Sequence, residues 1–145
     1  IATISPAANL TFQHDSMESV AGCYYITAID SFNNESPVSN RICIDNCPEY
    51  ILPNVFTPNG DGTNDFFIPL PYRDVKKIDF KIFNRWGELV FATADPGIHW
   101  DGRSLSTGAL CSDGVYFYTC DVFEIHLYGI EIRSLHGFVH IIGSK

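Results

Sequence analysis

Apolar and charged residues alternate along the middle of this chain, and the alternation is clearest in residues 77–82. Every second side chain there is apolar and those between are charged: Ile78, Phe80 and Ile82 against Lys77, Asp79 and Lys81. Because successive side chains of a β-strand point to opposite faces, this period of two predicts a strand in a sheet with one buried face and one solvated face.

Three further runs have the composition of strands: residues 24–29, 115–119 and 137–142. They are rich in β-branched and aromatic residues, and Gly and Pro interrupt the chain at short intervals between them. No segment has the sustained three-to-four-residue apolar spacing of an amphipathic helix. The pattern therefore predicts an all-β fold, an immunoglobulin-like or fibronectin-like β-sandwich.

The chain is expected to contain a partial module, residues 1–47, followed by a second domain, residues 48–145. In the first module, strand-like runs flank Asn33 and Asn34, which tolerate the left-handed backbone of a tight turn. This segment resembles the last hairpin of a fibronectin type III domain. The residues expected to face its core are Tyr24, Ile26 and Ala28. Half a sandwich cannot bury its own core, so we expect further strands upstream in a longer protein.

Composition and charge exclude several classes of function. The net charge is −8, and no stripe of Lys and Arg is present, which argues against binding to nucleic acid. No apolar run approaches the ~20 residues of a transmembrane helix. The chain begins at Ile1 without a signal peptide, as expected of a processed protein or a fragment.

Five cysteines are many for 145 residues. Their spacings lack the paired CxxC motifs of zinc ribbons, so disulfides in an oxidising compartment are the favoured interpretation and structural zinc the weaker one. We expect one disulfide between Cys111 and Cys120, and a second from Cys23 to either Cys43 or Cys47. The odd count leaves one thiol over.

A turn-rich loop at residues 59–65 carries the densest set of oxygen ligands. Two interpretations remain open: a calcium site, since calcium prefers several hard oxygens, or a network of Asx turns without metal. The candidate ligands are Asn59, Asp61, Thr63 and Asp65.

Catalytic motifs are missing from the sequence: it contains no nucleophile elbow, no HExxH, no P-loop and no dinucleotide fingerprint. The five histidines are scattered. We expect no enzyme activity and no required cofactor, with calcium as the one optional ligand.

Five motifs occur in a specific order: the segment 54–65, Phe83-Asn84-Arg85-Trp86-Gly87, Trp100-Asp101-Gly102, the run 113–118 and Gly137-Phe138-Val139-His140. In this order they resemble the gliding-motility-associated C-terminal domain, the type B sorting signal of the type IX secretion system in Bacteroidetes. The resemblance covers roughly residues 48–145.

This resemblance implies the end of a large cell-surface adhesin, held at the outer membrane. The implied partners are a PorP/SprF-like outer-membrane protein and components of the type IX translocon. The residues expected to contact a partner are Asn84, Arg85, Trp86, Gly87, Trp100, Asp101, Gly102, Phe138, Val139, His140, Ile141 and Ile142. A competing hypothesis is a calcium-stabilised carbohydrate-binding module, in which Trp86, Trp100 and Tyr116 stack on sugars.

Overall fold

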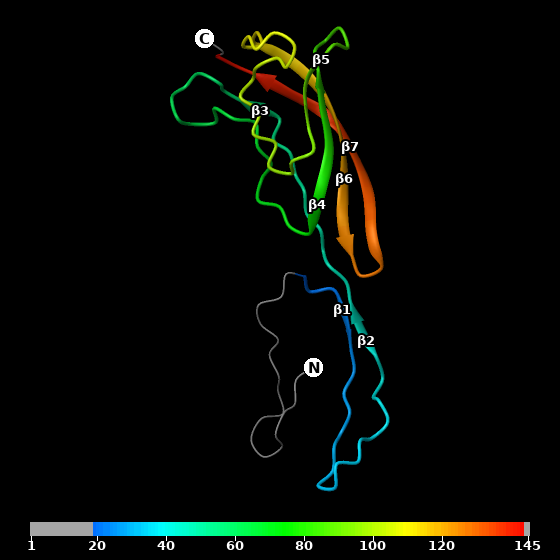
Figure 1. Cartoon of the computed structure of the whole chain (residues 1–145). Coiled ribbons are helices and arrows are strands. Elements are labelled where there is room, and N and C mark those ends of the chain that lie inside the picture. The colour runs from blue at the N-terminus through cyan, green and yellow to red at the C-terminus, as the bar shows by residue number, and fades with distance from the viewer. Residues whose placement is uncertain (1–18, 144–145) are drawn as a thin grey trace. The chain divides into compact units, whose positions relative to one another are not determined.

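The computed structural model describes residues 19–143 (Figure 1), and within that range the chain forms seven strands and no helix. The all-β prediction is therefore confirmed. The strands are β1 (Gly22–Tyr24), β2 (Ile42–Ile44), β3 (Val55–Phe56), β4 (Val75–Phe83), β5 (Leu89–Thr93), β6 (Gly114–His126) and β7 (Gly129–Ile141). Residues 19–143 therefore contain no helical segment that could span a membrane.

Two compact units share the chain, Ile1–Ile44 and Asp45–Lys145. The first contains the antiparallel pair β1–β2, in which Cys23 lies opposite Cys43 and is bonded to it. Of the two partners expected for Cys23, the structure selects Cys43, which confirms that disulfide, and leaves Cys47 as a free, exposed thiol.

The turn between these strands forms around Asp30, whose carboxylate accepts the N–H groups of Phe32 and Asn34. Asn33 takes the positive φ expected of it, 64°. The side chains expected to face a core are exposed, however: 76% of Ile26 is accessible, and Tyr24 is also exposed. Among the described residues of this unit, the pair β1–β2 has no second sheet to pack against.

The second unit is built on one five-stranded sheet with the order β3-β7-β6-β4-β5. Neighbouring strands are antiparallel except β3, which runs parallel to the end of β7. The alternation in β4 is confirmed, because Ile78, Phe80 and Ile82 are buried while Lys77 and Asp79 are exposed. We call the buried side of this sheet the inner face and the other side the outer face.

The inner face is covered by the segments that link the strands, which lie to one side of the sheet in Figure 1. Isolated β-bridges join these segments to one another, Phe67 to Trp100 and Glu49 to Arg73. This second layer closes the sandwich without long regular strands. The core between the two layers consists of Tyr50, Phe56, Phe67, Ile78, Phe80, Ile82, Val90, Ile98, Trp100, Cys111, Tyr116, Cys120, Val122, Val139 and Ile141.

The predicted disulfide between Cys111 and Cys120 is wrong, because both are free, buried thiols in the structure. The reason is the length of β6. Cys120 lies in the middle of this strand and Cys111 lies before its start at Gly114. Cys111 lies beside Tyr116, near the start of β6, and at about 3.3 Å per residue the four residues from Tyr116 to Cys120 span about 13 Å, beyond disulfide reach.

Candidate functional site

The loop at residues 59–65 is a network of Asx turns. Both carboxylate oxygens of Asp65 accept backbone N–H groups, from Gly60 at 2.6 Å and from Gly62 at 2.7 Å. Asp61 accepts from the N–H of Thr63 at 2.8 Å and from the side-chain amide of Asn59 at 2.8 Å. These hydrogen bonds, with that from Asn59 the strongest, lower the pKa of Asp61.

The hydrogen bonds of this loop are those of the turn network, and calcium binding stays a prediction. Each carboxylate oxygen of Asp61 and Asp65 accepts one hydrogen bond within the loop, which leaves each oxygen one further lone pair. Among residues 19–143, no three His, Cys, Asp or Glu side chains are grouped so that they could share a metal ion. Gly60 and Gly62 have φ of 78° and 86°, which explains the glycines at those positions.

The turn after β4 places Trp86 in solvent. Asn84 organises the turn, since its side-chain oxygen accepts the N–H groups of Trp86 and Glu88 at 3.0 Å each. Trp86 is 78% exposed, and the guanidinium of Arg85 lies 4.6 Å from the centre of its ring. The guanidinium of Arg85 thus stacks on Trp86, while Asp101 forms an ion pair with Arg103.

A hollow of about 420 Å³ lies beside this turn. Its other wall is the start of β6, where the hydroxyl of Tyr116 donates to the Ser112 carbonyl at 2.9 Å. Burial raises the pKa of Tyr116. The hollow is lined by Asn84, Arg85, Trp86, Ser112, Asp113, Gly114, Val115, Tyr116 and Phe117.

The second tryptophan turn is part of the core. Trp100 is 1% exposed, and its indole N–H donates to the Arg103 carbonyl at 2.8 Å. Gly102 is also buried, with a φ of 82°, and a Cβ there would lie 3.1 Å from Pro58. The predicted partner contacts at Trp100 and Gly102 are therefore corrected to structural roles, whereas Asp101 remains partly accessible.

The predicted contact residues at the end of β7 lie on both the inner and the outer face of the sheet. Val139 and Ile141 are buried and cannot touch a partner, which corrects the prediction for both. Phe138 and Ile142 are about half exposed, and the ring of His140 lies 5.5 Å from that of Phe138.

The outer face of the sheet carries an apolar row that the sequence interpretation did not identify. The strand register places Leu89 beside Phe83, Phe83 beside Phe117, and Phe117 beside Phe138. Leu89, Phe117 and Phe138 are exposed, although a solvated face is normally polar. The sequence indicated this row in residues 115–118, where the side chains expected on both faces of the strand are apolar.

We call the continuous surface formed by this row and the neighbouring turn the exposed aromatic surface. The two parts meet at Phe117, which belongs to the row and also lines the hollow. Exposed apolar patches of this kind mark interaction sites in soluble proteins. Its residues are Phe83, Arg85, Trp86, Leu89, Val115, Phe117 and Phe138.

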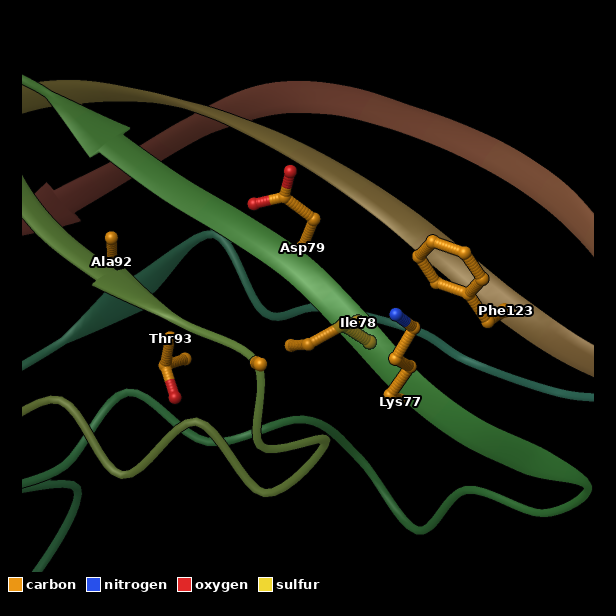
Figure 2. Close-up of a pocket in the computed structure, with 7 residues that line it drawn as sticks. Lys77, Ile78, Asp79, Ala92, Thr93 and Phe123 are labelled. Carbon is orange, nitrogen blue, oxygen red and sulfur yellow. The ribbon is translucent and has the colours of Figure 1, made fainter.

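A second hollow of about 410 Å³ lies further along the outer face (Figure 2). Figure 2 shows the ammonium group of Lys77 next to the ring of Phe123, and their distance is 4.4 Å. Asp79 forms an ion pair with Lys81 at 2.8 Å. These charges are satisfied locally, and we assign no chemistry to this hollow.

The comparison with protein families gives a specific match. The family model described as the CHU_C type IX secretion signal domain matches residues 50–140, which is more than half of the chain. No curated protein matches this chain.

Proposed function

The chain belongs to the CHU_C type IX secretion signal domain family, and from this membership we propose how its cargo and its partner use the domain. The family makes residues 50–140 a sorting signal, which directs the protein carrying it to the cell surface or the outer-membrane region. It is not a family of catalysts. We propose that the cargo is a large cell-surface adhesin of a gliding bacterium, and that the domain docks on a PorP/SprF-like outer-membrane protein and on the translocon.

The exposed aromatic surface supports this docking role. Trp86 is exposed, and the guanidinium of Arg85 stacks on its ring. Aromatic and arginine side chains dominate the binding energy of protein interfaces. Phe117 and Phe138 extend the surface over two further strands. An apolar row on the solvated face adds nothing to the core, so covering it with a partner accounts for its composition.

The carbohydrate-binding alternative has little support in the geometry. It requires three aromatic platforms, but Trp100 is 1% exposed and Tyr116 is 7% exposed. Of the three, Trp86 alone is exposed, and the guanidinium of Arg85 already stacks on its ring.

The decisive test is the export of a reporter. A fluorescent protein with a signal peptide is fused ahead of the whole 145-residue chain and expressed in a bacterium that has a type IX secretion system. We expect the reporter at the cell surface, in complex with the PorP/SprF-like protein. Retention of the wild-type fusion in the periplasm would contradict the proposal.

Single substitutions then locate the contact. Trp86→Ala is expected to lower surface export about tenfold, since a buried interface tryptophan often contributes more than 1.4 kcal/mol. Tyr128→Ala is the matched control, because Tyr128 is an equally exposed aromatic side chain, 89% accessible, in the turn between β6 and β7. Equal export of the two variants would exclude the exposed aromatic surface as the docking site.

A further inference from the structure

We propose that β7 accepts an extended segment of a secretion-machinery protein as an additional strand along its free edge, residues 130–138. This proposal rests on the proposed sorting function and specifies how the partner is held. Sheet edges bind partner strands through main-chain hydrogen bonds, and neighbouring side chains supply the selectivity.

The free edge follows from the pairing of β7. Strand β6 pairs with β7 along its whole length, from Gly129 to Ile141, with no irregularity in the register. On the other side, β3 pairs only with His140 and Ile141. Within the described residues, no other strand or bridge pairs with residues 129–139 of β7. Figure 1 shows β7 beyond β6 at this side of the sheet.

The direction of the free backbone groups can be read from the end of the strand. His140 donates its N–H to the Asn54 carbonyl at 2.8 Å, and Ile142 donates to Phe56 at 3.3 Å, so both direct their amides away from β6. Since backbone direction alternates along a regular strand, every second residue before them does the same. The residues that present a free N–H and C=O are Ile130, Ile132, Ser134, His136 and Phe138.

This edge lacks the features that usually block strand addition. Residues 129–141 contain no proline and no lysine, and no bulge interrupts them. The one arginine, Arg133, is held by Glu124 of β6, at 2.6 Å between guanidinium and carboxylate. Its charge therefore lies over the sheet and does not prevent another strand from pairing with the edge.

A partner protein fits this edge better than a second copy of the chain. Pairing two copies of β7 in antiparallel fashion about Ser134 would join the two sheets edge to edge. Both outer faces would then point the same way, so neither copy would cover the exposed aromatic surface of the other. A ladder of nine residues also buries far less than the roughly 1,200 Å² of a stable interface.

The same edge ends at the exposed aromatic surface, because Phe138 belongs to both. A protein that adds a strand beside residues 130–138 can therefore also cover Phe117 and Trp86. The added strand continues the line of β3 along β7. An apolar side chain beside Phe138 would extend the apolar row onto that strand.

Proline substitution tests the main-chain contact directly. Ser134→Pro removes one outward N–H and leaves the ladder to β6 intact, so the fold is expected to tolerate it. Ser134→Ala is the matched control, since both variants lose the hydrogen bond from the Ser134 hydroxyl to Asp121. In the reporter assay we expect export to fall about tenfold for Ser134→Pro relative to Ser134→Ala, as one hydrogen bond is lost and the ring clashes.

The outcomes separate this proposal from the function on which it rests. Equal export of Ser134→Pro and Ser134→Ala would overturn strand addition while the sorting function stands. Failure of the wild-type fusion to reach the surface would overturn the sorting function, and strand addition with it. A photo-reactive residue at Ser134 that cross-links a second copy of the chain, and no secretion protein, would also overturn the proposal.

Hydrogen exchange keeps the test decisive if Ser134→Pro fails to fold. In the free wild-type chain, the amides of Ser134 and His136 should exchange fast, and those of Arg133 and Leu135 slowly, because the latter bond to β6. In the purified complex with the outer-membrane protein, Ser134 and His136 should become protected. Unchanged fast exchange at both positions in that complex would overturn strand addition.

Discussion

Asp45 and His126 form an ion pair, with 3.1 Å between Oδ2 and Nδ1, that ties the first residue of the second unit to the end of β6. The other oxygen of Asp45 accepts the N–H of Leu127 at 2.6 Å. The neighbouring amide of Asn46 donates to the Ile125 carbonyl at 2.8 Å. Together these contacts hold the entry of the chain against the β6–β7 hairpin.

This pair predicts a pH-dependent stability. The hydrogen bond to Asp45 raises the pKa of His126, with smaller contributions from the charges of Asp45, Glu131 and Glu124, although burial opposes them. Burial would raise the pKa of Asp45, but the hydrogen bonds from Leu127 and His126 outweigh it and the pKa is lowered.

The pKa shifts of His126 and Asp45 determine how the free energy of unfolding changes with pH. The contribution of His126 is complete below its ordinary pKa of 6.5 and is lost as pH rises through the raised value. The contribution of Asp45 is complete above its ordinary pKa of 3.8 and is lost only in acid. The free energy of unfolding should therefore decrease as pH rises above about 6.5, through the raised pKa of His126. His126→Gln should flatten this decrease in urea titrations; an unchanged slope would assign it to other groups.

Asp65 is expected to be the main stabilising residue of the loop at residues 59–65. Asp65→Ala leaves the amides of Gly60 and Gly62 without their acceptor, which should cost about 1–2 kcal/mol of unfolding free energy. Thr63→Ala is the control, because the hydrogen bonds of the loop involve the backbone N–H and carbonyl groups of Thr63, which the substitution keeps.

Calcium should leave the melting temperature of the wild-type protein unchanged, since calcium prefers about six to eight oxygen ligands and no group of three acidic side chains that could hold a metal ion occurs among residues 19–143. The measurement is a thermal melt with and without millimolar calcium. A rise that grows with calcium concentration would instead reveal binding to the folded state.

The thiols should react in a fixed order. Burial raises the pKa of Cys120 to about 12 and also raises the pKa of Cys111, whereas Cys47 is exposed. Iodoacetamide should thus modify one thiol per chain in the native protein, and three after unfolding without a reductant. Mass spectrometry counts the additions. A single addition after unfolding would show that Cys111 and Cys120 are bonded after all.

The two tryptophans should differ sharply in their effect on stability. Trp100→Ala removes a ring packed among Phe56, Phe91 and Tyr116, and should lower the unfolding free energy by about 3–5 kcal/mol. Trp86→Ala should change it by no more than about 0.5 kcal/mol, because the side chain is exposed. Urea titrations followed by circular dichroism compare the two. Equal losses would mean that Trp86 packs against the fold in solution.

The features that the sequence determined are those that depend on near neighbours. The alternation around Ile78, Phe80 and Ile82 predicted which side chains of β4 are buried, because a strand has a period of two whatever its partners. The order of the five motifs indicated the family, which the match to residues 50–140 confirmed. The disulfide from Cys23 to Cys43 was one of two open alternatives, since a hairpin brings its own ends together.

The features that only the tertiary structure decided depend on residues far apart in the chain. Trp86 and Trp100 are both followed by turn residues, yet one lies in solvent and the other is enclosed by rings from β3, β5 and β6. Cys111 and Cys120 are apart because β6 is a long strand. It is long because it pairs with β4 as far as Glu124 and with β7 as far as His126. The free edge of β7 exists because β3, more than seventy residues earlier, pairs with His140 and Ile141 and then ends. Pairing between distant strands carries no local pattern, so its consequences cannot be read from alternation and turns alone.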